Sequence, residues 1–251
     1  MKIELFNVNE WAGIDDKQLL HLLNVTYNAF SLMVGKDLKK DIVVTNNKYP
    51  TPQIDHFTNN KEPYKIDLTI PDGFDWCKII FQFSHEICHA YCNFNDAQKH
   101  RQKWFEEVIC DAASFSNLYN ISKNWNLLKV KDGLPTWCHQ SYIKEYIEIL
   151  FSQYNTATGL SGTQINKHID INLANLEANS LQRKWLRDVN RVVSIYLCEN
   201  IFYKSPPSWK ACIYLNRWPV PYNGSFEEFI DSWKTLGDRH VSKIIQALEL
   251  T

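Results

Sequence analysis

Short stretches in the first 70 residues alternate apolar and polar positions with the period of two that β-strands show. Residues 1–7 and 64–70 alternate in this way, and residues 41–45 form a β-branched run. In 64–70 the apolar positions that share a face are Tyr64, Ile66, Leu68 and Ile70. The pattern predicts three strands of a small mixed sheet. Residues 46–63, rich in Asn, Pro, Thr and Lys, are predicted to be a loop.

Apolar residues recur with the helical period through much of the remaining chain. A wide apolar face predicts a helix over 17–34, preceded by Asp15 and Asp16 as capping residues. From residue 136 onward the pattern predicts helices only. The other predicted helices are 76–93, 104–120, 138–154, 166–179, 181–203 and 225–250, the last opening on a Ser225–Glu228 capping box and broken near Gly237.

These elements predict an α+β fold with its sheet near the N-terminus. A chain of 251 residues, 45% of them hydrophobic, has room for one large domain or two small ones. We expect residues 1–122 to form a core that contains the sheet and the helices over 76–93 and 104–120. We expect residues 123–251 to form a helical subdomain, and the two parts to be the walls of one cleft.

The predicted helix over 76–93 carries the sequence H-E-x-x-H, formed by His85, Glu86 and His89. Helical residues four apart lie one above the other, about 6 Å apart along the axis, so both imidazoles can bind one metal ion. Imidazole and carboxylate groups in an apolar run are costly unless they are paired or bind metal. A catalytic Zn²⁺ takes three protein ligands and a water, and Glu86 is placed to take a proton from that water.

The predicted helix over 104–120 offers the third ligand. Apart from a few small polar residues, its polar positions are Glu106, Glu107 and Asp111. We favour Glu107, because only Glu107 has a carboxylate one helical turn later, at Asp111, that can orient a neighbouring ligand. Glu106 stays open as the alternative ligand.

H-E-x-x-H followed by E-x-x-x-D resembles the site of the gluzincin metallopeptidases, the thermolysin-like family. The resemblance covers roughly residues 64–119 and implies a zincin-like fold with one Zn²⁺ held by His85, His89 and Glu107. It also implies that Glu86 is the general base and that Asp111 hydrogen-bonds a ligand histidine. The gap before Glu107 is slightly shorter than in thermolysin, and no G-x-M-E-N segment precedes the motif. Position 92 is Cys and position 95 is Asn, which excludes the metzincin pattern.

The resemblance also implies an edge strand beside the cleft, at 64–70. An edge strand offers unpaired backbone groups to an extended peptide, so Tyr64, Ile66, Leu68 and Ile70 are predicted to mark a substrate-binding strand. The expected partner is a peptide or protein substrate. A further side chain is expected to stabilise the oxyanion of the reaction. The candidates are Tyr142, Tyr146, His139, His168 and Tyr214.

Net charge and cysteine content limit the partners and the cellular location that the sequence predicts. A net charge of −1 gives no reason to expect a nucleic acid or an anionic membrane as partner, and no apolar stretch has the length needed to cross a bilayer. The N-terminal residues lack the pattern of a secretory signal. The seven cysteines are odd in number, and four lie in or beside the two metal-site helices, so we expect buried free thiols and a cytoplasmic location. Cys88 and Cys92 are four apart, but Cys88 lies between the two histidines in sequence and is therefore predicted to point to a different face from them.

The function expected from these features is zinc-dependent hydrolysis of peptide bonds, on small or unfolded peptides rather than folded proteins. Two alternatives stay open. One is a non-catalytic zinc-binding module of a toxin or stress-response system. The presence of Glu86 argues against this alternative, because a structural zinc site needs no general base. The other is a repressor-cleaving metalloprotease, although no basic helix-turn-helix is found in the sequence.

Overall fold

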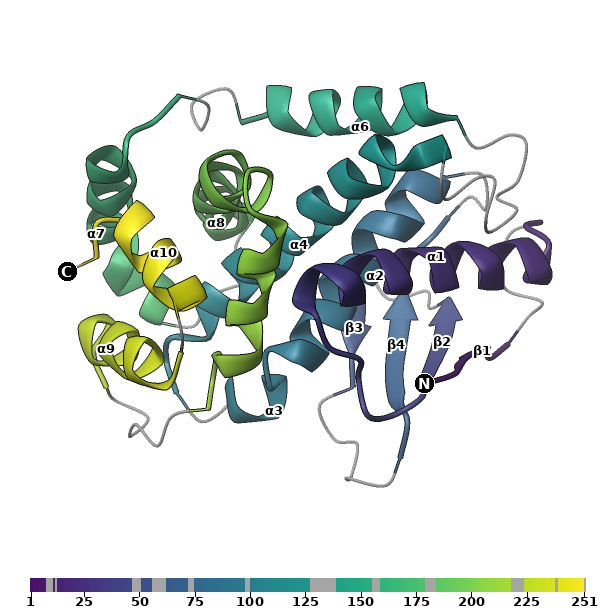
Figure 1. Ribbon diagram of the computed structural model, residues 1–251, viewed down its shortest axis with the longest axis horizontal. Helices are drawn as coiled ribbons and strands as arrows, with labels where there is room; N and C mark the ends of the chain where they lie inside the picture. Colours follow the sequence, from purple (N-terminus) through teal and green to yellow (C-terminus); the bar gives the residue numbers. More distant parts are fainter. Residues whose placement is uncertain are drawn as a thin grey trace. The chain divides into compact units, whose positions relative to one another are not determined.

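The computed structural model describes residues 1–7, 11, 13–46, 51–55, 62–71, 75–97, 100–126, 139–154, 159–178, 184–217, 224–237 and 239–250. Within these residues the chain is α+β, with a small sheet in the N-terminal part and helices elsewhere (Figure 1). Cys138, where one helix was expected to begin, lies outside the described residues. No helix among the described residues is both long enough and apolar enough to cross a membrane.

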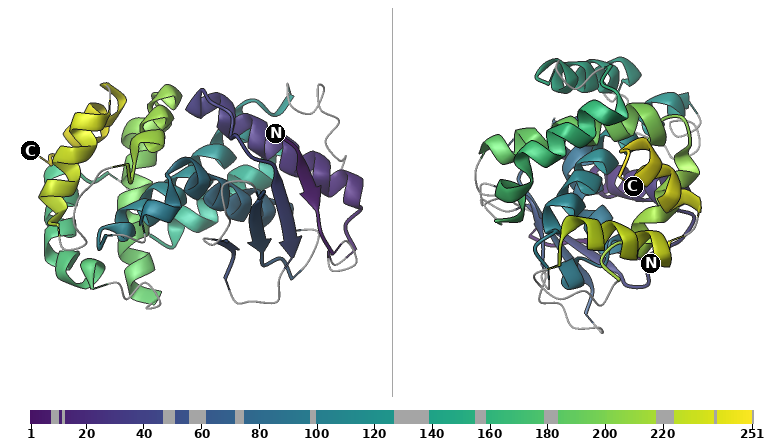
Figure 2. Two further views of the ribbon diagram at one scale, coloured as in Figure 1. Left: turned by 90° about the horizontal axis from the view of Figure 1, so that it is seen from below. Right: turned by 90° about the vertical axis from the view of Figure 1, so that its left-hand side faces the viewer.

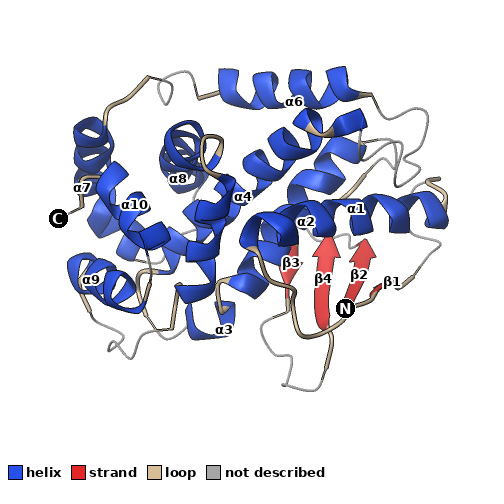
Figure 3. Cartoon of the chain, in the orientation of Figure 1, coloured by secondary structure: helices blue, strands red, loops and turns tan. Residues whose placement is uncertain are grey.

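The sheet has four strands in the order β1-β2-β4-β3, coloured red in Figure 3. The three predicted strands are confirmed as β1 (Ile3–Leu5), β2 (Ile42–Asn46) and β4 (Tyr64–Leu68), which run parallel to one another. The alternation in β4 marks its buried face, since Ile66 is only 1% exposed and Leu68 is fully buried. The sheet is mixed, as predicted, because β3 (Gln53–Ile54) is antiparallel to β4.

The prediction that residues 64–70 form an edge strand is wrong. β4 pairs with β2 along its whole length and with β3 on its other side, where Ile54 lies opposite Ile66 and Gln53 opposite Asp67. The backbone of Asp55 also donates to the carbonyl of Lys65 at 2.9 Å. β3 lies within the segment predicted to be a loop, and two residues are too few to show an alternating pattern. Tyr64, Ile66 and Leu68 therefore belong to an inner strand, and Ile70 follows it; the side chains of Ile66, Leu68 and Ile70 are buried.

Three long helices confirm the predictions for the first half of the chain. They are α1 (Asp16–Val34), α2 (Trp76–Tyr91) and α4 (Lys103–Lys123). Carboxylates cap the first two helices, because Asp15 accepts from the backbone of Gln18 at 3.0 Å and Asp75 accepts from that of Lys78 at 3.2 Å. A short helix, α3 (Phe94–Ala97), lies between α2 and α4 in the chain.

The second half of the chain is helical in its described residues, as predicted. The predicted helix over 181–203 is α8 followed by a π-helical segment, η2. A 3₁₀ helix, η3, follows it. Ser225 forms the predicted capping box with Glu228, and α9 ends at Gly237. Figure 2 shows α7 to α10 grouped together, in green to yellow. The bounds are α6 (Gln140–Ser152), α7 (Gly162–Glu177), α8 (Lys184–Leu197), η2 (Cys198–Phe202), η3 (Pro206–Tyr214), α9 (Phe226–Leu236) and α10 (Arg239–Ala247).

The chain divides into two compact units. The first contains Met1–Leu32, Lys36–Ala90 and Ala113–Ile149, and the second contains Met33–Gly35, Tyr91–Ala112 and Leu150–Thr251. The points of division fall inside α1, α2, α4 and α6, so these helices contribute residues to both units. The division into 1–122 and 123–251 expected from the sequence stays a prediction.

Candidate metal centre

Helix α2 carries the three residues of the H-E-x-x-H motif in its C-terminal half. His89 is 7% exposed and Glu86 2% exposed, while His85 is half-buried. The helical spacing of four residues places the rings of His85 and His89 next to each other, with centroids 4.9 Å apart. Both rings therefore lie on one stripe of the helix, as the sequence predicted.

Two side chains of α4 fasten its C-terminal half to α2 within the first unit. The hydroxyl of Ser114 donates to the carbonyl of Phe81 at 2.8 Å. The amide of Asn117 donates to the hydroxyl of Ser84 at 2.9 Å and to the carbonyl of Thr26 in α1 at 2.9 Å. Ser84 directly precedes His85, so the helix surface that carries the first histidine is held in register by buried hydrogen bonds.

The N-terminal half of α4 belongs to the second unit and is held by contacts within that unit. Trp104 and Phe105 pack against aromatic residues of α9, with centroids 4.8 Å apart for Trp104 and Phe226. The hydroxyl of Ser194, in α8, donates to the carbonyl of Val108 at 2.8 Å. Apolar packing and a buried hydrogen bond thus fix the turn of α4 that carries Glu106 and Glu107.

His85, His89 and Glu107 each place one potential ligand atom within 4.8 Å of the others. Ligand atoms of one tetrahedral Zn²⁺ lie about 3.3 Å apart, as follows from zinc–ligand distances of about 2.0–2.1 Å. The separation in the structure is close enough for small side-chain rotations to complete such a site. Two imidazoles and a carboxylate are also a ligand set of catalytic zinc sites. The residues present therefore fit the metal ion that the motif implies.

Two further groups overlap this one among the described residues. His89 and Glu106 approach Cys110, and Cys110 also approaches Cys88 and Cys92, in each case with ligand atoms within 4.8 Å of one another. Cys88 and Cys92 are four apart in the sequence, whereas Cys110 comes from the other helix, α4. All three thiols are fully buried, and a thiol must lose its proton to bind metal, at a high cost in apolar surroundings. This cost favours the histidine–glutamate group over the thiol group as the metal site.

The cysteines in the described part of the chain are all free and buried. This agrees with the expectation of buried thiols. They are Cys77, Cys88, Cys92, Cys110, Cys198 and Cys212.

Asp111 lies one helical turn after Glu107 and is half-buried. Its carboxylate is 3.6 Å from the Nε atom of Arg191, in α8. Arg191 also donates to the hydroxyl of Tyr154 at 2.8 Å. Burial alone would lower the pKa of Arg191, but the charges and hydrogen bond of Asp111, Tyr154 and Asp188 raise that pKa overall. The hydrogen bond expected from Asp111 to a ligand histidine stays a prediction. The structure adds a partner of Asp111 that the sequence analysis missed, Arg191, which is 80 residues away in the chain.

The five candidates for oxyanion stabilisation have different surroundings. Tyr146 packs its ring against Phe81, with centroids 6.5 Å apart, and Phe81 is one helical turn before His85. His168 is engaged with the carbonyl of Val189 at 3.3 Å. Tyr142 is 52% exposed and contacts the ring of His139. Tyr214 is the last residue of η3. Tyr146 thus contacts α2 one helical turn before the first histidine of the motif.

The choice between Glu107 and Glu106 gives a direct prediction. Glu107→Ala is expected to weaken Zn²⁺ binding by about 1,000-fold or more, because it removes a ligand. Glu106→Ala should weaken binding by only about 10–100-fold, the range found when residues that support the ligands are lost. Competition with a chromophoric chelator measures both affinities. The reverse order of effects would place the metal at the His89–Glu106–Cys110 group instead.

Comparison of this chain with protein-family models, with curated proteins and with solved structures finds no match, so the geometry described above is the basis for assigning a function.

Proposed function

We propose that this protein is a zinc-dependent hydrolase that cleaves peptide bonds. The observation that carries the proposal is the convergence of His85, His89 and Glu107, with Glu86 next to the first histidine on the same helix. A structural metal site needs its ligands but no additional acid or base. A glutamate at this position of the motif is what a hydrolytic site requires.

The chemical roles follow from the positions of the side chains. His85, His89 and Glu107 would hold the ion, which when bound supplies an acidified water and polarises the carbonyl of the substrate. Glu86 accepts the proton of the attacking water at its carboxylate and delivers it to the leaving amine. Its low exposure limits competing water around the proton it carries.

Burial at the centre also bears on the kind of substrate. Glu86 and His89 are both less than one-tenth exposed, so a scissile bond has to reach largely buried groups. An extended chain can enter such a site, whereas a folded domain presents its backbone only in bulky, hydrogen-bonded elements. We therefore propose peptides or unfolded segments as substrates. Because β4 is paired on both sides, its backbone is not proposed to bind them.

The test is hydrolysis of a diverse peptide mixture at neutral pH, followed by mass spectrometry. Zinc-loaded protein is expected to produce new cleavage products, and the same preparation treated with a chelator is expected to lose them. Activity should return when Zn²⁺ is added back. Products that persist after the metal is removed would count against a metal-dependent hydrolase.

The same burial favours a second candidate, a zinc-binding module that does not turn over substrate. A metal ion held by partly buried side chains can stabilise the fold instead of performing chemistry. This candidate predicts zinc-dependent stability without cleavage of any peptide in the mixture. The presence of Glu86 favours the hydrolase.

A further inference from the structure

A buried chain of hydrogen bonds in the second unit ends on Glu106. The side-chain amide of Asn216 donates to a carboxylate oxygen of Glu106 at 2.7 Å and to the carbonyl of Cys92 at 2.9 Å. Its oxygen lies 2.9 Å from the Nε2 atom of His100. The three side chains are only 2–4% exposed. A polar chain this deeply buried is costly unless its members satisfy one another, so its arrangement is well defined.

The hydrogen bonds fix the direction of this chain. The Nδ1 atom of His100 accepts from the backbone of Gln102 at 3.1 Å, so Nε2 carries the proton and donates to the oxygen of Asn216. Burial lowers the pKa of His100, although Asn216 and Asp96 act in the opposite direction, and the lowered pKa favours the neutral ring that these hydrogen bonds require. With its oxygen held by His100, the amide of Asn216 turns its nitrogen toward Glu106.

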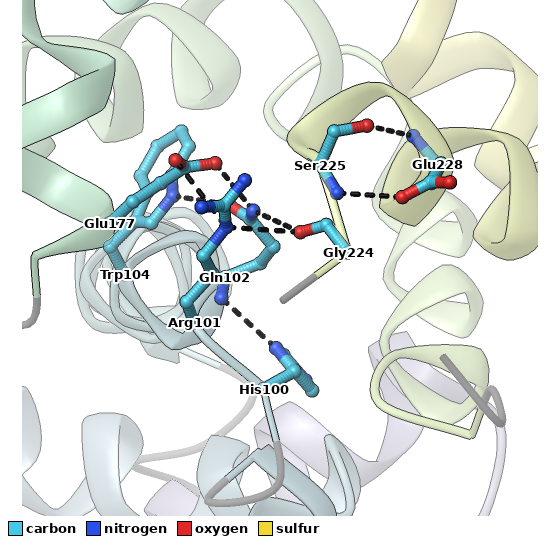
Figure 4. A network of polar contacts seen from close by, with 8 residues as sticks. All are labelled: His100, Arg101, Gln102, Trp104, Glu177, Gly224, Ser225 and Glu228. Carbon is cyan, nitrogen blue, oxygen red and sulfur yellow. Dashed lines mark hydrogen bonds and ion pairs between the residues drawn. The ribbon is translucent and has the colours of Figure 1, made fainter. Parts of the chain in front are cut away.

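The segment that carries His100 is itself anchored. Figure 4 shows Gln102 bonded to Glu177 of α7, at 2.6 Å, and to the carbonyl of Gly224, at 3.0 Å. The indole of Trp104 donates to the side-chain oxygen of Gln102 at 3.0 Å. These contacts fix the start of α4 and, with it, the position from which Glu106 extends.

Glu106 is thereby held beside a proposed metal ligand. Its carboxylate, one nitrogen of His89 and the sulfur of Cys110 all lie within 4.8 Å of one another. Histidines that bind metal with one ring nitrogen commonly donate the other N–H to a carboxylate, which sets the orientation and basicity of the ring. We infer that Glu106 orients His89 for metal binding and that Asn216 is a positioning residue that holds Glu106 in place. This inference rests on the proposed metal site.

Asn216 can be tested with little disturbance of the backbone. Its φ is +61°, a left-handed conformation that glycine adopts without strain and alanine does not. Asn216→Gly therefore removes the amide and leaves the turn intact. We expect its affinity for Zn²⁺, measured by competition with a chelator, to fall by about 10–100-fold. The matched control is Asn190→Ala, another asparagine in the same unit with only 2% exposure, which should bind Zn²⁺ within about threefold of wild type.

A double-mutant cycle separates positioning from a general loss of structure. If Asn216 acts through Glu106, Asn216→Gly should cost less than about threefold in Zn²⁺ affinity when Glu106 is already Ala. The visible spectrum of the Co²⁺-loaded protein should change in Asn216→Gly and stay unchanged in Asn190→Ala. Equal losses in the two backgrounds, or wild-type affinity in Asn216→Gly, would overturn the inference and leave the metal site standing. A wild-type protein that takes up no Zn²⁺ would overturn both.

Discussion

Replacing Glu86 by Gln is expected to lower peptide turnover by about 10²–10⁴-fold, the usual contribution of a general acid–base group. Glutamine keeps the size and much of the packing of this buried side chain but cannot accept the proton of water. The three proposed ligands remain, so Zn²⁺ binding should stay close to that of wild type. A selective loss of turnover, with KM little changed, is the signature of a group that acts in the transition state.

The measurement is kcat and KM on the best peptide from the mixture, with the Zn²⁺ content of each preparation determined in parallel. Glu148→Gln is the control, because it makes the same chemical change at an exposed position of α6. It should turn over peptide as wild type does. Cleavage that survives in zinc-loaded Glu86→Gln would show that the activity belongs to another site or to a contaminant.

Replacing His89 by Ala is expected to remove metal binding and the stability that depends on it. His89 belongs to two of the three candidate ligand groups, the one with Glu107 and the one with Glu106. The metal ion therefore cannot move from one of these glutamates to the other to compensate for the loss of His89. A ligand that binds only the folded state stabilises it by about 4 kcal/mol when present at about 1,000 times its dissociation constant. The melting temperature of wild type should rise with added Zn²⁺, and that of His89→Ala should not.

His139→Ala provides the matched control, since His139 is an exposed histidine of the described chain. Its melting temperature should respond to Zn²⁺ as wild type does. Thermal unfolding is followed with and without Zn²⁺ for all three proteins. A Zn²⁺-dependent rise in the His89→Ala variant as large as that of wild type would mean that the metal binds elsewhere.

Local patterns predicted most of the elements, because they reflect burial within one strand or helix. Ile66 and Leu68 alternate with polar residues and are buried, and the Ser225 capping box lies where its sequence placed it. The hydrophobic pattern did not predict which strands pair with each other, because strand pairing depends on residues far apart in the chain. β3 is too short to carry a periodic signal, and the resemblance suggested an edge strand where the structure has an inner one.

In the candidate site, too, the sequence predicted the local arrangement but not the contacts between distant residues. His85, Glu86 and His89 share one helix, so their spacing alone predicts that they lie near one another. Glu107 could be proposed because its helix follows soon after. Asn216 and Arg191 could not be found in this way, since they reach Glu106 and Asp111 from 110 and 80 residues away and their positions depend on tertiary packing. No periodic or motif signal in the sequence marks either residue.

The ligands of the bound metal test the account most directly, because the three candidate groups differ in sulfur content. X-ray absorption at the zinc edge of the zinc-loaded wild-type protein reports the ligand elements and their distances. The account predicts nitrogen and oxygen ligands at about 2.0–2.2 Å, with the scattering pattern of two imidazoles and no sulfur. Sulfur at about 2.3 Å would contradict it, and would place the ion at Cys110 with its neighbours instead of at His85, His89 and Glu107.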